Sequence, residues 1–171
     1  GKKETNQLIG DYFKPATSFE ELLEDKTFFL LKGSARNLSK IPDESIDYCF
    51  TDPPYGGSIQ YSELTFLWRS WLKMSHDFTE EEIIINSYQN KSEDDFEEML
   101  SEAFSEIYRV LKPGHWLSVT FNNRDQRVWE ALVNSCYSAG FDLVNIVPQK
   151  PVGNSFVQSW TGFSLKRDLI L

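Results

Sequence analysis

Four consecutive residues combine hydrogen-bond acceptors with an aromatic ring in a pattern that suits the binding of an amino group. The sequence reads Asp52-Pro53-Pro54-Tyr55. An ionised aspartate only accepts hydrogen bonds, and the carbonyl oxygen of Pro53 is a second acceptor whose position the prolines restrict. Together the two groups can accept both N–H bonds of an exocyclic amine, as on adenine or cytosine, while Tyr55 stacks on the base. The alternative is a Pro-Pro turn with an incidental aspartate.

Such a pocket could also activate the amine. The lone pair of an adenine or cytosine amine is delocalised into the ring, so these amines are poor nucleophiles. Two acceptors that draw the hydrogens out of the ring plane would redirect the lone pair toward an electrophile. A base inside a duplex cannot reach the pocket and must be flipped out, at a cost that base–aromatic stacking of about 1–3 kcal/mol would help to offset.

The predicted position of the four residues favours a functional site. Residues 46–51, Ile-Asp-Tyr-Cys-Phe-Thr, form a short strand pattern that ends where the prolines prevent further pairing. Ligands of open α/β sheets bind beyond the carboxyl ends of the strands. Gly56 and Gly57 follow directly, and we expect them to form a loop that orders around a flipped base.

A second strand end contributes two asparagines. Asn122 and Asn123 follow the strand predicted over 115–121, so they should lie on the same sheet edge as Asp52 and contact substrate or cofactor. The alternative is that Asn123 and Asp125 cap the next helix.

Short apolar segments alternate with amphipathic helices, which predicts an α/β fold with a mainly parallel sheet. The last two strands are close enough in sequence to form an antiparallel pair at the sheet edge. Trp68 and Trp71 lie on the apolar side of a helix and are predicted to be core residues. We expect one domain over 27–171, preceded by an N-terminal extension over 1–26 with a short helix from Ser18. Strands are predicted at 27–31, 46–51, 115–121, 141–147 and 166–171, and the longer helices start at about Ser62, Ser92 and Asp125.

The motif resembles the D-P-P-Y motif of the S-adenosylmethionine-dependent amino-methyltransferases, which methylate adenine or cytosine in DNA. The resemblance extends over nearly all of residues 27–171 and implies part of a three-layer, Rossmann-like class I methyltransferase fold. It implies transfer of a methyl group from S-adenosylmethionine to adenine N6 or cytosine N4, with adenine favoured because Asp opens the motif in most adenine enzymes. The other matching segments are Lys32-Gly-Ser-Ala-Arg36, Pro42-Asp-Glu-Ser45, Tyr61-Ser-Glu-Leu64, Glu106 to Gly114 and Trp116 to Phe121.

The resemblance also implies roles for individual residues. Asp52 and the Pro53 carbonyl would hold the amine, with Pro54 and Tyr55 completing the catalytic motif. Gly33 and Ser34 would lie beside the cofactor adenosine, together with Asp52, although the family more often has Gly-Asp there.

One part of the family pattern is absent. The family binds the methionine part of its cofactor with a Gly-rich turn such as Phe-x-Gly-x-Gly, and none of the nine glycines forms one. We therefore expect the cofactor half before Gly1 or after Leu171. The isolated chain should be inactive, and a homodimer is one way to cover its open sheet edge.

The overall charge at first argues against nucleic-acid binding, because the net charge is −9 and the isoelectric point is about 4.7. Between Asp77 and Glu106, however, there are eleven acidic residues and one basic residue, Lys91, so the remaining residues sum to +1. We expect feeble DNA binding by this chain alone, with phosphate contacts supplied from outside it.

Other classes are less well supported. The two cysteines show no C-x-x-C spacing, which indicates reduced thiols and predicts no metal site. The sequence contains neither an apolar run long enough to span a membrane nor a signal peptide, so we expect a cytoplasmic protein. Two alternatives remain: a non-catalytic nucleic-acid-binding or interaction module, and an RNA or protein-glutamine N-methyltransferase, whose related motif usually begins with Asn.

Overall fold

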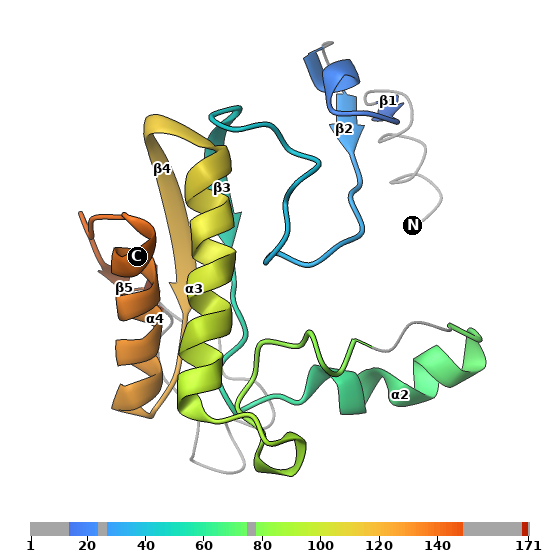
Figure 1. Ribbon diagram of the computed structural model, residues 1–171, viewed down its shortest axis with the longest axis vertical. Helices are drawn as coiled ribbons and strands as arrows, with labels where there is room; N and C mark the ends of the chain where they lie inside the picture. The colour runs from blue at the N-terminus through green and yellow to red at the C-terminus, as the bar shows by residue number, and fades with distance from the viewer. Residues whose placement is uncertain (1–13, 24–26, 75–77, 149–168, 171) are drawn as a thin grey trace.

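The computed structural model describes residues 14–23, 27–74, 78–148 and 169–170. Most of the strand predicted at 166–171 therefore lies outside the described residues. Within them the chain forms an α/β structure, as the alternating pattern predicts, with one larger sheet and three α-helices (Figure 1).

The larger sheet has the strand order β3-β4-β6-β5. β3 (Ile46–Thr51) and β4 (Leu111–Phe121) are parallel, whereas β6 (Leu169–Ile170) is antiparallel to both β4 and β5 (Val147–Pro148). The predicted antiparallel pair at the edge is confirmed. Only one of the described pairings in this sheet is parallel, so this part of the sheet is less parallel than predicted.

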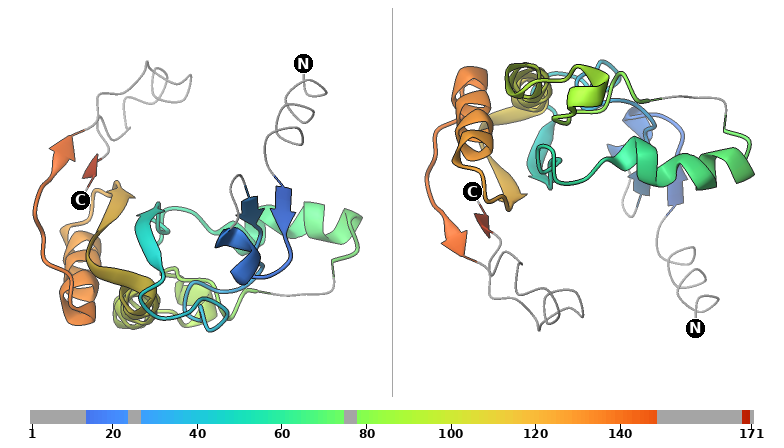
Figure 2. Two further views of the ribbon diagram at one scale, coloured as in Figure 1. Left: turned by 90° about the horizontal axis from the view of Figure 1, so that it is seen from above. Right: turned by 90° about the horizontal axis from the view of Figure 1, so that it is seen from below.

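Two helices cover one face of β3 and β4 (Figure 2). α3 (Glu93–Val110) begins with a capping box between Ser92 and Asp95, and α4 (Gln126–Ala139) begins at its N-cap Asp125 and ends at Gly140, which adopts a positive φ of 105°. Both helices pack against β4 and bury the apolar side that their 3.6-residue periodicity predicts. The main core cluster consists of Phe96, Leu100, Phe104, Ile107, Leu111, Val119, Phe121, Val128, Ala131 and Leu132.

The opposite face of β3 and β4 carries exposed aromatic side chains. Tyr48 and Phe50 alternate with the core-facing Cys49, and Tyr48 is in register with Trp116 on β4. Their exposed fractions are 54%, 59% and 59% for Tyr48, Phe50 and Trp116. Among the described residues, no third layer covers this face, so the three-layer arrangement remains an expectation.

Two predicted strand boundaries are wrong. The strand expected over 141–147 forms only at Val147, because residues 141–146 make no ladder with any described strand and Leu143 and Val144 are exposed. β4 begins at Leu111 and not at His115. Lys112 to His115 instead form an irregularity in the pairing with β3, with Gly114 at φ 74°.

The N-terminal elements form a separate small sheet. β1 (Lys14–Ala16) pairs in parallel with β2 (Thr27–Phe29), and the 3-10 helix η1 (Glu20–Leu23) lies between them in the chain. The predicted strand at 27–31 thus does not join the larger sheet (Figure 1). The predicted helix from Ser18 is a single 3-10 turn in the described residues, and Glu21 accepts from the backbone N–H of Thr17 at 2.7 Å.

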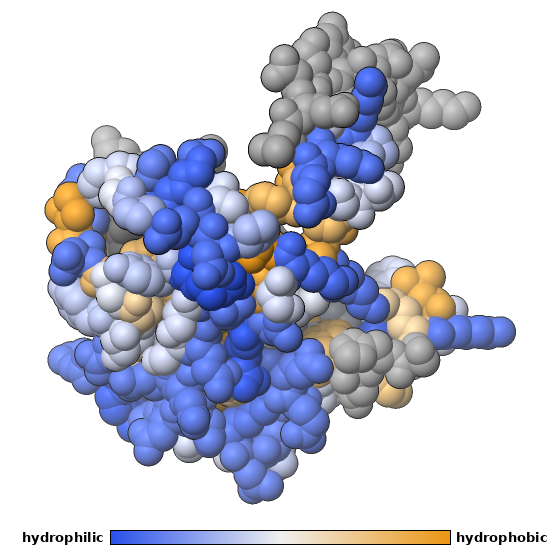
Figure 3. Space-filling model, turned by 45° about the horizontal axis from the view of Figure 1, so that its top comes forward, coloured by the Kyte–Doolittle hydropathy of each residue, from blue (hydrophilic) through white to orange (hydrophobic). Residues whose placement is uncertain are grey.

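α2 (Tyr61–Trp71) forms where predicted, but its apolar side is not in the core. Trp68 is 62% exposed and Trp71 is 72% exposed, so the prediction that they are core residues is wrong. The periodicity identified the helix correctly, but periodicity alone does not say what the apolar side packs against. Figure 3 shows hydrophobic side chains at the surface in the region of this helix.

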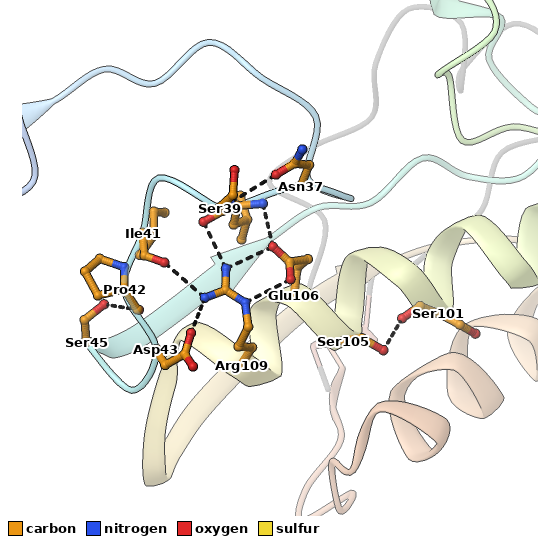
Figure 4. A network of polar contacts seen from close by, with 11 residues as sticks. Asn37, Ser39, Ile41, Pro42, Asp43, Ser45, Ser101, Ser105, Glu106 and Arg109 are labelled. Carbon is orange, nitrogen blue, oxygen red and sulfur yellow. Dashed lines mark hydrogen bonds and ion pairs between the residues drawn. The ribbon is translucent and has the colours of Figure 1, made fainter.

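Arg109 on α3 fixes the connection between β2 and β3 (Figure 4). Its guanidinium donates to the carbonyl oxygens of Leu38 at 3.0 Å and Ile41 at 3.1 Å, and it forms ion pairs with Glu106 and Asp43. The hydrogen bond from Arg109 holds the pKa of the Glu106 carboxyl below its ordinary value. Residues 38–43 of this connection are therefore held against α3.

The cysteines are isolated thiols. Cys49 and Cys136 are both half-buried and free, and burial raises the pKa of Cys49 and raises the pKa of Cys136 to about 12. Both thiols therefore remain protonated at neutral pH, as expected of structural cysteines. Across the described ranges, no helix combines the length and the apolar character that a bilayer crossing requires.

Candidate functional site

Asp52 lies directly beyond the carboxyl end of β3, as the sequence predicts. Its carboxylate is exposed, whereas Pro53 is buried and fixes the chain at the sheet edge. The hydroxyl of Tyr55 donates to Asp52 Oδ1 at 2.8 Å. This bond occupies one carboxylate oxygen and leaves acceptor capacity on Oδ2, so Tyr55 orients the carboxylate as well as presenting an aromatic ring.

The Tyr55 ring is supported from the core. It packs edge-to-face on Phe121 with the centroids 5.4 Å apart, and Phe121 in turn packs edge-to-face on Trp129 at 4.8 Å. Phe121 is fully buried at the end of β4. The neighbouring strand and α4 thus determine where the tyrosine of the motif lies.

Asn123 connects the two strand ends. Its amide Nδ2 donates to the backbone carbonyl of Tyr55 at 3.0 Å, and its Oδ1 accepts from the N–H of Asp125 at 2.8 Å. Asp125 caps α4 by accepting from the N–H of Arg127. The capping alternative is confirmed for Asp125, while Asn123 positions the motif itself; Asn122 precedes it at the same edge.

Neighbouring atoms lie so close to the backbone at the two positions after the motif that both positions require glycine. Gly56 has a φ of 58°, and a Cβ atom there would lie 3.0 Å from Val128 Cγ1. A Cβ atom on Gly57 would lie 3.2 Å from the carbonyl oxygen of Ile85. The glycines therefore let the motif loop pack closely on α4 and on the segment before α3.

Replacement of Gly56 by alanine should lower the free energy of unfolding by about 1–2 kcal/mol from the left-handed backbone alone, with a further loss from contact with Val128. Gly114→Ala separates the two causes, because Gly114 also has a positive φ but no atom within 4 Å of the added Cβ. Urea unfolding of the three proteins measures the difference. Equal stability of Gly56→Ala and Gly114→Ala would show that the contact with Val128 is unimportant.

Two residues that the sequence analysis did not single out link the motif loop to the segment before α3. Gln60 donates to the carbonyl oxygens of Gly57 and Ile85, each at 3.2 Å, and accepts from Asn86 Nδ2 at 2.7 Å. Asn86 is buried and caps the 3-10 helix η2 (Ser87–Gln89). The only local signal was that Asn is a favoured capping residue.

A buried acidic residue contacts the N-terminus of α2. Glu82 Oε1 accepts from the backbone N–H of Ser62 at 2.9 Å, so this carboxylate caps the helix N-terminus. Partial burial, followed by the charges of Asp52 and Glu82, raises the pKa of Tyr61 above its ordinary value. The Tyr61 phenol therefore keeps its proton at neutral pH and can donate a hydrogen bond near Asp52.

Gly33 and Ser34 lie elsewhere. They line a groove against α3 with Glu98 and Glu102, and Arg36 forms an ion pair with Glu102. In the part of the chain that the structure describes, no hydrogen bond or ion pair joins Gly33 or Ser34 to the Asp52 motif, so their cofactor role stays a prediction. The same residues bring together no cluster of three or more His, Cys, Asp or Glu side chains that could hold a metal ion.

The fold and the site define an α/β protein in which an acidic and aromatic motif lies at the carboxyl end of a sheet strand, the place where such sheets bind ligands. No protein-family model matches the sequence, and no curated protein matches it significantly.

Solved structures do resemble it. One is TTHA0409 from Thermus thermophilus, provisionally described as a DNA modification methylase, in complex with S-adenosyl-L-methionine; the identity is 20%, the match covers 81% of this chain and 51% of that one, and the TM-score is 0.46. A second structure of the same protein gives 18% identity, coverages of 81% and 50%, and a TM-score of 0.46. The 4+2 cyclase SpnF gives 20% identity, coverages of 75% and 37%, and a TM-score of 0.39. The chain spans about half the length of TTHA0409.

Proposed function

We propose that this chain carries the amine-binding part of an S-adenosylmethionine-dependent DNA methyltransferase that acts on adenine N6 or cytosine N4. The observation that carries the proposal is the position of Asp52 and Pro53 at the carboxyl end of β3, with the Asp52 carboxylate exposed and oriented by Tyr55. This position offers a substrate amine two acceptors, the side-chain carboxylate of Asp52 and the backbone carbonyl of Pro53. Adenine is favoured because the motif opens with Asp.

The residues of the chain would act on the amine and the base. Asp52 Oδ2 and the Pro53 carbonyl accept the two N–H bonds, which exposes the nitrogen lone pair for attack on a methyl group. Tyr55 stacks on the base of a nucleotide flipped out of the duplex. Gly56, Gly57 and Asn123 hold the loop that surrounds the base, and Asn122 lies at the same edge.

S-Adenosylmethionine would supply the electrophilic methyl group when bound. The candidate contacts for this cofactor are Gly33, Ser34 and Asp52. The fit is only partial, because no described hydrogen bond or ion pair joins Gly33 or Ser34 to the Asp52 motif and the sequence has no Gly-rich turn. The proposal therefore includes a cofactor-binding half supplied from outside residues 1–171. The uncovered aromatic face of β3 and β4 and the unpaired edge of β3 among the described strands support this part, and a homodimer is the alternative way to cover them.

The test is transfer of a radioactive methyl group from S-adenosylmethionine to DNA, followed by identification of the modified nucleoside. The chain alone should bind the cofactor weakly or not at all by calorimetry, and addition of the Gly-rich half should give micromolar binding and transfer. N6-methyladenine would establish the favoured base and N4-methylcytosine the other. DNA binding without any transfer would favour the non-catalytic module, and transfer only to RNA or to a protein glutamine would favour the second alternative.

A further inference from the structure

Glu82 is the only acidic or basic residue that is buried among the described residues, at 7% exposure. Burial of a carboxylate is unfavourable unless hydrogen bonds replace the water that it loses. Glu82 Oε1 accepts from the backbone N–H of Ser62, but neither Glu82 Oε2 nor the buried Ser62 Oγ has a hydrogen-bond partner in the described part of the chain. A buried acid with one unpaired oxygen adds little to stability, so its position requires another explanation.

The bond from Glu82 to Ser62 fixes one end of the loop that follows the Asp52 motif. This loop, residues 56–60, runs from Tyr55 to the first turn of α2. It is also bonded to the motif, because the N–H of Ser58 donates to the carbonyl oxygen of Tyr55 at 3.1 Å. A shift of the first turn of α2 would therefore be transmitted to the motif through this short loop.

Neighbours of Glu82 hold the middle of the same loop. The N–H of Ile85 donates to the carbonyl oxygen of Gly56 at 3.4 Å, and the Gln60 side chain bonds to Ile85 and Asn86. Figure 1 shows this segment, which precedes α3, beside the chain that leads from β3 to α2. Residues 82–86 therefore contact the chain at several points between Gly56 and Ser62.

Lys91 holds residues 82–86 in place. Its ammonium donates to the carbonyl oxygens of Thr79 and Glu82, each at 2.6 Å. Asn86 and Lys91 also exchange two backbone hydrogen bonds of 2.9 Å. These bonds fix the backbone of Glu82 independently of α2, so Glu82 can act as an anchor for the start of that helix.

We propose that Glu82 is a positioning residue for methyl transfer, which fixes the loop at 56–60 by holding the first turn of α2. The inference rests on the proposed function and adds a residue to it. In this role Glu82 contacts neither the amine nor the base, and it acts through the position of the Asp52 motif. A misplacement of about 1 Å that originates far from the reacting atoms can lower a rate by about a hundredfold.

The first test is methyl transfer by this chain combined with the cofactor-binding half, at saturating DNA. Glu82→Ala should lower kcat by about 10- to 100-fold, because the amine is bound but poorly oriented. The KM for DNA should change little, since the proposed phosphate contacts lie outside this chain. Glu82→Gln should restore most of kcat, because the amide Oε1 can still accept from the N–H of Ser62.

Asp95→Ala is the matched control for a loss of stability. The Asp95 carboxylate also lies at a helix N-terminus, where it accepts from the backbone N–H of Ser92 at 2.7 Å, but it forms no described hydrogen bond with residues 56–60. Its loss should lower the urea midpoint and leave kcat unchanged at a temperature at which all variants are folded.

Amide hydrogen exchange on the chain alone tests the anchor without substrate or cofactor. Glu82→Ala should speed the exchange of the Ser62 and Ile85 amides by about tenfold relative to that of Leu100, which lies in the core of α3 and reports global stability. Glu82→Gln should keep the wild-type ratio. Because the ratio corrects for global unfolding, a general loss of stability does not change it.

Wild-type kcat in Glu82→Ala, an equal loss in Glu82→Gln, or an equal loss in Asp95→Ala would each overturn the inference. An unchanged exchange ratio in Glu82→Ala would overturn it whatever the transfer rate. Faster exchange in Glu82→Ala, together with no transfer by the wild-type chain and the cofactor-binding half, would contradict the proposed function alone and support the anchoring of the loop by Glu82.

Discussion

Replacement of Asp52 by alanine is expected to lower methyl transfer by at least about a hundred- to a thousandfold, the effect of removing one polar group that stabilises a transition state. The carboxylate is exposed at the end of β3 and supplies one of the two proposed acceptors for the amine. Its loss leaves the Pro53 carbonyl alone, so one N–H bond has no protein acceptor and the lone pair stays delocalised in the ring. The assay is single-turnover transfer by this chain combined with the cofactor-binding half.

Two variants make the result specific. Asp47→Ala removes an aspartate from the other end of the same strand, where it pairs with Lys112 at the surface, and should leave transfer unchanged. Tyr55→Phe removes the hydroxyl that bonds to Asp52 Oδ1 but keeps the ring, so it should reduce transfer less than Asp52→Ala does. Wild-type transfer rates in Asp52→Ala would refute the role proposed for the motif.

The largest effect on stability is expected from Phe121→Ala, which should lower the free energy of unfolding by about 3–5 kcal/mol. Phe121 is fully buried and its ring contacts the rings of both Tyr55 and Trp129. Alanine would leave a cavity between β4, α4 and the motif loop. Urea unfolding followed by circular dichroism measures the change.

Phe50→Ala is the matched control, because Phe50 lies on the neighbouring strand but is 59% exposed. Its effect should be within about 0.5 kcal/mol, as for most surface substitutions. Phe121→Leu fills most of the cavity but removes the aromatic edge contacts, so it should be more stable than Phe121→Ala. Equal losses in Phe50→Ala and Phe121→Ala would contradict the assignment of Phe121 to the core.

Local signals in the sequence were sufficient for the elements that build the core. The limits of β3, α3 and α4 agree closely with the prediction, because two prolines end β3, Ser92 and Asp125 cap the helices, and Gly140 ends α4. Pairing depends on distant residues and was less predictable. Residues 27–29 pair with 14–16 and not with β3, and residues 141–146 are mostly apolar but have no neighbouring strand in the described sheet.

The site was predictable in its chemistry but not in its support. Asp52 and Tyr55 were recognisable because adjacent residues form the motif and a strand pattern precedes it. Gln60 and Asn86 were not, because their contacts join segments 25 or 26 residues apart and leave no periodic pattern in the sequence. Trp68 and Trp71 illustrate the same limit, since the periodicity of a helix identifies its apolar side but not the residues that pack against that side.

The distribution of the core along the chain determines how different regions can open. The ten residues of the main core cluster lie between Phe96 and Leu132, in the continuous run of α3, β4 and α4, whereas the Asp52 motif belongs to an earlier part of the chain that is attached to that run. Amide hydrogens in α3 and β4 should therefore exchange with solvent only through global unfolding, while those of residues 56–60 can exchange through local opening. The loop that would receive a flipped base can thus rearrange at a cost well below the total stability of the protein.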